Sequence, residues 1–155
     1  MLDTWSEFHQ FVQVTVEPVP SMDRLVGPEV RHLFEWWSSF GPDAIPRRRD
    51  FDIADHAAIA SNVFLVRMVG RGHFQFRVQG EAVVQLIGRS NAGLDVRLDG
   101  DDPHLAELAR YYQSIAMQRT CKRCWGTLAM LNKSHRHFES IDCALDREPG
   151  EVGFI

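Results

Sequence analysis

The stretch FQFRVQGEAVVQLIGR, residues 74–89, decides the fold of this chain. Its first six residues alternate apolar and polar side chains, which is the two-residue period of a half-buried strand. Gly80 breaks that period, and the apolar residues of 81–87 then recur every three to four positions, as on one face of a short helix. Gly88 predicts the end of this helix, because glycine accepts a left-handed backbone conformation. A strand that turns at a glycine into a short helix predicts a small α+β domain of the sensor type.

Working outward, the same two periods predict the remaining elements. Residues 63–69 are strongly apolar and predict a strand that pairs with residues 74–79 through a hairpin turn at Gly70-Arg71-Gly72. Residues 102–119 predict a long amphipathic helix, with Asp102 as its N-cap. Further strands are expected at 125–131, 137–145 and 151–155. The expected fold class is therefore α+β, with a five-stranded antiparallel sheet and with the long helix and short helices packed on one face.

The N-terminal part predicts an arm, residues 1–26, and then a helix, residues 28–40, that opens the single domain 27–155. Apolar side chains cover more of this helix than one contact with a sheet requires, so we expect it to be covered on more than one side. Its aromatic residues predict the interface of a homodimer, because aromatic side chains are enriched at interface cores. The alternative is that the arm covers the helix. The interface candidates are Phe34, Trp36, Trp37 and Phe40.

Composition limits the classes of protein to consider. Among 155 residues, 45% are hydrophobic and 25% are charged, and the net charge is −4, which is typical of one globular domain. The basic residues are dispersed, which argues against nucleic-acid binding. No apolar run is long enough for a membrane span and the first residues are unlike a signal peptide, so a cytoplasmic protein without membrane contact is expected. Three cysteines, an odd number, favour reduced thiols.

Several motifs, in order, resemble those of the small stand-alone PAS-domain proteins of bacteria. A Trp-bearing helix precedes the loop Pro46-Arg47-Arg48-Arg49-Asp50-Phe51-Asp52, and an apolar strand and the Phe74–Val78 strand follow. Gly80–Val83 and Gly88-Arg89 come next, with Gly93 closing the loop, and Phe138-Glu139 matches an aromatic-Glu pair in the penultimate strand. The resemblance covers roughly residues 30–155. It implies a sensory or regulatory module that binds a small ligand or a partner between the sheet and the long helix, and it does not imply an activity.

Metal and cofactor chemistry has little support in the sequence. Cys121 and Cys124 form a C-x-x-C pair with His135, His137 and Cys143 downstream, but residues three apart on a strand face opposite ways, so no zinc site is predicted. His104 is the best-placed histidine for haem, yet it stands at the second position of the long helix and is expected to face solvent. The cysteines lack the context of a flavin-reactive thiol. The cofactor, if there is one, is left unknown.

Four side chains are candidates for lining a ligand pocket between helix and sheet: Phe76, Tyr112, Trp125 and Met130. Plain core packing is the alternative for each of them. Arg77 and Glu139 are expected to pair across neighbouring strands. No nucleophile–base motif or phosphate loop is present, so we expect no enzyme but a sensor that signals by protein contact, with a homodimer and a signalling protein as possible partners. The alternative is a small α+β enzyme or a carrier of hydrophobic ligands.

Overall fold

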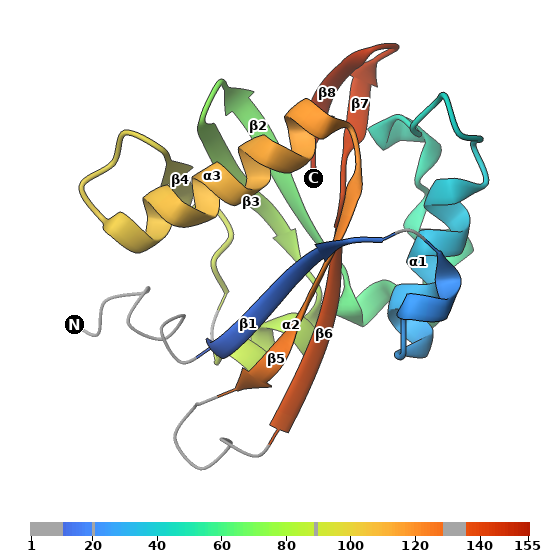
Figure 1. Cartoon of the computed structure of the whole chain (residues 1–155), viewed down its shortest axis with the longest axis horizontal. Coiled ribbons are helices and arrows are strands. Elements are labelled where there is room, and N and C mark those ends of the chain that lie inside the picture. The colour runs from blue at the N-terminus through green and yellow to red at the C-terminus, as the bar shows by residue number, and fades with distance from the viewer. Residues whose placement is uncertain (1–10, 20, 89, 129–135) are drawn as a thin grey trace.

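The computed structural model describes residues 11–19, 21–88, 90–128 and 136–155, whose strands form two sheets (Figure 1). All of the pairings between these strands are antiparallel. One sheet has the order β4-β3-β2-β8-β7, with β2 at Phe64–Gly70, β3 at His73–Gln79, β4 at Asp95–Arg97, β7 at Leu145–Glu148 and β8 at Glu151–Phe154. The other has the order β1-β5-β6, with β1 at Phe11–Pro18, β5 at Cys121–Leu128 and β6 at Arg136–Cys143. The α+β class and the five-stranded antiparallel sheet are confirmed.

The membership of the five-stranded sheet differs from the expected one. Residues 137–145 were expected to form one strand, but only Ala144 separates β6 from β7, and there the chain passes from one sheet to the other. The backbone groups of Ala144 are bonded to residues outside the strands. Its N–H donates to the Thr120 carbonyl at 3.0 Å, and its carbonyl accepts from Trp37 Nε1 at 2.8 Å. The segment containing β4, where no strand was expected, supplies the fifth strand instead.

Residues 74–88 fold into the strand and the short helix that their hydrophobic periods predict. The hairpin β2–β3 turns between Gly70 and His73, and α2 (Glu81–Ile87) follows β3 directly. Gly80 is required at that junction, because a Cβ there would lie 2.3 Å from the carbonyl oxygen of Ser61. Gly88 has φ +96° and closes α2 in the left-handed conformation.

The long helix α3 (Pro103–Gln118) lies across the five-stranded sheet and makes the main core with it (Figure 1). Asp102 caps the helix as expected, since its carboxylate accepts from the amides of His104 and Leu105. The buried face of α3 carries Ala109, Tyr112, Ile115 and Ala116, which pack against sheet residues that include Val66, Phe74, Phe76 and Val96. The hydrophobic period of the helix therefore predicts its buried face correctly.

A second core lies under α1 (Pro28–Ser38), which covers the face of the β5–β6 hairpin that points away from α3 (Figure 1). Leu25 and Phe34 pack there on Cys121, Ile141 and Cys143. The connecting segments are the 3₁₀ helices η2 (Met22–Arg24), η3 (Arg48–Asp50) and η4 (Ile53–Asn62). Strand β6 is thus covered on both faces, by α1 on one side and α3 on the other, because successive side chains of a strand point to opposite faces.

Candidate functional site

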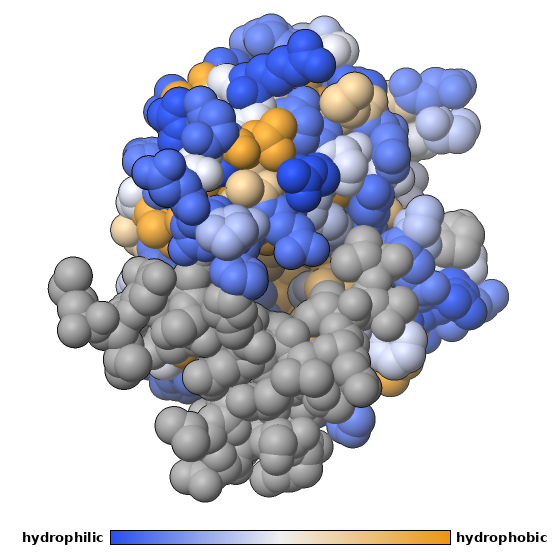
Figure 2. Space-filling model, turned by 60° about the vertical axis from the view of Figure 1, so that its left-hand side comes forward, coloured by the Kyte–Doolittle hydropathy of each residue, from blue (hydrophilic) through white to orange (hydrophobic). Residues whose placement is uncertain are grey.

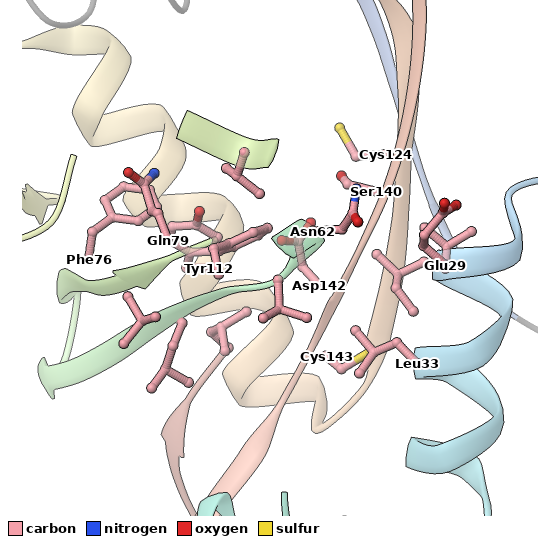
Figure 3. A pocket seen from close by; sticks show the side chains of 18 of the residues that line it. Glu29, Leu33, Asn62, Phe76, Gln79, Tyr112, Cys124, Ser140, Asp142 and Cys143 are labelled. Carbon is pink, nitrogen blue, oxygen red and sulfur yellow. The ribbon is translucent and has the colours of Figure 1, made fainter. Parts of the chain in front are cut away.

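A large cavity opens between α3, α2 and the inner faces of the two sheets (Figure 3). Its volume is about 1290 Å³, which exceeds the roughly 300–1,000 Å³ of typical small-molecule pockets. On the sheet and helix side its wall is mostly apolar, and it includes Phe64 of β2, Phe76 of β3, Val83 and Leu86 of α2, and Leu108 and Tyr112 of α3. The cavity extends around β6 to α1, where Glu29 and Leu33 line it (Figure 3).

The opposite wall, made by β5 and β6, is polar. Cys124 stands opposite Ser140 in the register of the two strands, and Lys122 stands opposite Asp142, so these four side chains share one face. That face carries Asp142, Ser140 and Cys124 along the cavity, across from Phe76 and Tyr112 (Figure 3). The cavity therefore has one apolar side and one side with hydrogen-bonding groups.

Asp142 is the most unusual of these polar groups. It is only 5% exposed, and its carboxylate accepts a hydrogen bond from the Tyr111 hydroxyl at 2.6 Å. Burial raises the pKa of Asp142 to about 6, and the hydrogen bond from Tyr111 opposes this increase only in part. Lys122 does not neutralise the carboxylate, because its Nζ donates to Ser114 Oγ at 2.9 Å. Among the ion pairs of the described residues, none includes Asp142.

The neighbouring acids are held neutral. Burial, together with the charge of Asp142, raises the pKa of the Cys124 thiol to about 12. Burial and the same carboxylate also raise the pKa of the Tyr111 hydroxyl well above its usual value. A thiolate or phenolate is the nucleophilic form of such a group. At neutral pH, Cys124 and Tyr111 therefore offer hydrogen-bond donors rather than reactive anions.

Two of the four expected pocket residues line this cavity together. Phe76 and Tyr112 face each other edge to face, with ring centroids 6.3 Å apart. The structure does not bring Trp125 to the cavity: its side chain is 42% exposed, on the face of β5 that carries Arg123. Met130 lies outside the described residues.

The aromatic residues of α1 are largely occupied within the chain. Phe34 is buried and stacks with Trp37, whose indole N–H is bonded to the Ala144 carbonyl. Trp36 packs on Phe51 and His56, at centroid distances of 5.1 and 5.6 Å. Phe40, beyond the end of the helix, contacts Trp36 and remains 39% exposed. Contacts within the chain thus account for much of the apolar surface on which a homodimer was expected.

The cysteines differ from the expectation of three free thiols. Cys121 and Cys143 stand directly opposite each other on β5 and β6 and form a disulfide, which leaves Cys124 free. The sequence indicated the odd number of cysteines but not the strand register that pairs two of them. Cys121 and Cys124 do face opposite sides of the hairpin, as the strand period requires. His135 lies outside the described residues, and the residues that are described hold no group of three metal-binding side chains.

The expected pair of Arg77 and Glu139 is wrong, because the two residues belong to different sheets. Arg77 donates to Gln75 at 3.2 Å. Glu139 instead accepts from the amides of Val26 and Gly27, just before α1, and from Arg123 Nε at 2.6 Å. Burial raises the pKa of Glu139, but these hydrogen bonds outweigh burial and hold it below its ordinary value.

Sequence reasoning missed Tyr111 and Asp142, the polar pair in the cavity wall. A signal was present, since Asp142 is the one charged residue in the otherwise apolar run 141–145. Whether Asp142 lines the cavity, however, depends on which face of β6 points inward, and the sequence does not show that. His104, the histidine considered for haem, is exposed at the second position of α3, at the edge of the cavity.

Two antiparallel sheets joined through Ala144, with a long helix across one of them and a ligand-sized cavity between helix and sheets, place the protein in the class of small α+β domains. The family model described as PAS domain matches residues 26–141 of the chain. The protein therefore belongs to the PAS-domain family, and the resemblance seen in the sequence is confirmed. No curated protein and no solved structure matches the chain. No helix within the described ranges is long and apolar enough to cross a membrane.

Proposed function

We propose that this protein is a sensory module that binds one small, largely apolar molecule in the cavity between α3 and the sheets. A PAS domain is in general a sensory or regulatory unit. The observation that carries the proposal is the cavity itself, with its volume of about 1290 Å³ and its apolar wall. The raised pKa values of Cys124 and Tyr111 favour a binding site over an enzyme, because neither group supplies an activated nucleophile.

The signal leaves by protein contact, and strand β6 connects the cavity with the surface helix. Asp142 lies on the cavity side of this strand, while the adjacent Ile141 and Cys143 pack under α1. A ligand that shifts β6 therefore also shifts the support of α1. We place the protein in the cytoplasm and propose that α1, in a homodimer or with a signalling protein, presents the result.

Binding of the neutral fluorescent probe N-phenyl-1-naphthylamine tests this proposal. Wild type should bind about one probe per chain, and Val83→Phe should weaken binding about tenfold by filling the cavity. The matched control is Val69→Phe, because Val69 is 46% exposed on β2 and does not line the cavity. Equal weakening by both substitutions, or by neither, would place the probe outside the cavity and reject the proposal.

A further inference from the structure

The cavity contains a negative charge that the described part of the protein leaves without a counter-ion. Asp142 is 5% exposed and lies in the cavity wall, with the Tyr111 hydroxyl as the partner of its Oδ2 atom. A hydroxyl group satisfies one lone pair but carries no positive charge. An ionised carboxylate away from water is unfavourable unless a cation accompanies it.

The nearest candidate cation on the same face is engaged elsewhere. Lys122 stands opposite Asp142 in the strand register, yet its ammonium group donates to Ser114 on α3. The other buried carboxylate of this region shows the usual arrangement. Asp146 of β7 receives Arg119 through two hydrogen bonds of 2.8 and 3.1 Å and also accepts from the Gly150 amide. Asp142 has no such guanidinium among the described residues.

The remaining groups around Asp142 also suit a donor-bearing ligand. Ser140 lies two residues before it on the same face, and the Cys124 thiol stands opposite Ser140. These hydroxyl and thiol groups can accept hydrogen bonds as well as donate them. Across the cavity, Phe76, Tyr112 and the α2 side chains offer an aromatic and aliphatic surface. The cavity is therefore acidic around Asp142 and apolar where Phe76, Tyr112 and α2 face it, whereas the charged side chains of Arg48, Glu107 and Arg110 line other parts of it.

We infer that the cavity takes an organic amine, with its protonated amino group paired to Asp142 and its apolar body against Phe76, Tyr112 and α2. This inference rests on the proposed function, since it names the class of ligand for the same cavity. It excludes fatty acids and other anionic apolar molecules as preferred ligands, because a carboxylate at the acidic pole would be repelled by Asp142. The apolar contacts hold the ligand, and the charge pair selects it.

Three probes of one shape and different charge test the inference: tryptamine (cationic), tryptophol (neutral) and indole-3-acetate (anionic). Isothermal titration at neutral pH should show tryptamine binding at least about tenfold more tightly than tryptophol, with indole-3-acetate weakest. Asp142→Asn removes the charge but keeps the size of the side chain and an acceptor for Tyr111. In this variant tryptamine and tryptophol should bind with affinities within about threefold of each other.

The control is Asp99→Asn, which removes an equal charge at an exposed residue paired with Arg97, outside the cavity lining. It should keep the preference for tryptamine. If tryptophol binds wild type as tightly as tryptamine, or if Asp142→Asn keeps the preference, the inference fails while the proposed cavity stands. If none of the three indoles binds and the neutral naphthylamine probe also fails, the proposed function and the inference are both rejected. If only indole-3-acetate binds, the inference is overturned directly.

Discussion

Replacing Asp142 by Asn should stabilise the ligand-free protein at neutral pH. Burial raises the pKa of Asp142 from the ordinary 3.8 to about 6 in the folded state. When folding raises the pKa of a carboxyl group, the stability that this group contributes is fully present below its pKa in the unfolded chain. That contribution is lost as the pH rises through its pKa in the folded protein. This rise in the pKa of Asp142 corresponds to a loss of about 3 kcal/mol of unfolding free energy in the wild type at pH 7.5.

Urea denaturation, followed by tryptophan fluorescence, measures this difference at two pH values. At about pH 7.5, Asp142→Asn should be more stable than wild type by up to about 3 kcal/mol, and at about pH 4.5 the advantage should shrink to about 1 kcal/mol. The change with pH isolates the ionisation of Asp142, because any cost of the new amide group is present at both pH values. The titratable groups that face Asp142 are Tyr111 and Tyr112 from α3 and Lys122 and Cys124 from β5, and these remain in both proteins.

Glu139, on the same strand but on the opposite face, supplies the matched control. Its pKa is lowered, because the amides of Gly27 and Val26 and the Arg123 guanidinium outweigh the effect of burial. The stability that Glu139 contributes is therefore present above its pKa in the unfolded chain, and it is lost as the pH falls through its pKa in the folded protein. Glu139→Gln should lower the unfolding free energy by about 1–3 kcal/mol at neutral pH, and by less in acid. The reasoning is refuted if Asp142→Asn destabilises the protein equally at both pH values, or if the two variants respond to pH with the same sign.

Three further predictions follow from other parts of the molecule. Phe74→Ala should lower the unfolding free energy by about 3–5 kcal/mol, whereas Phe76→Ala should cost measurably less, because Phe76 borders the cavity while Phe74 is enclosed; equal losses in urea denaturation would contradict an open cavity. Light scattering at micromolar concentration should give the mass of two chains for wild type and of one chain for Phe40→Glu, and a wild-type monomer would reject the dimer. Maleimide labelling of the acid-quenched, denatured protein should modify one thiol per chain, Cys124, before reduction and three thiols after it, because Cys121 and Cys143 are joined; three labelled thiols before reduction would contradict the disulfide.

Local sequence patterns predicted the local structure well. The alternation in 74–79 and the caps at Gly88 and Asp102 all depend on the neighbouring few residues, and all three are confirmed. The buried face of α3 was predictable for the same reason, since a helix presents every third or fourth residue to its partner. These features locate the apolar half of the cavity, including Phe76 and Tyr112.

The polar half depended on long-range register, which the sequence does not contain. Alternation shows which residues of a strand share a face but not which face is inward. On β5 the face with the large aromatic Trp125 points away from the cavity, and the face with Lys122 and Cys124 points into it. Hydrophobicity therefore favours the opposite choice. The disulfide of Cys121 with Cys143 and the place of Glu139 beneath α1 follow from the same register.

The arrangement of β6 explains why a polar strand belongs in this core. A strand buried on both faces is usually apolar throughout, yet this one carries Asp142 toward the cavity and Glu139 toward α1. Glu139 accepts hydrogen bonds from the amides of Val26 and Gly27 and from Arg123, and these bonds connect the start of α1 to the sheet. Among the described residues Asp142 has only the Tyr111 hydroxyl as a hydrogen-bond partner, so its ionisation lowers the stability of the ligand-free protein. One strand thus holds a carboxylate with several hydrogen-bond donors at the start of α1 and a buried carboxylate with one hydroxyl donor in the cavity wall. A cation bound at Asp142, as we infer, would offset the cost of that ionisation, and any shift of β6 on binding would reach Glu139 and the start of α1, because both carboxylates belong to this strand.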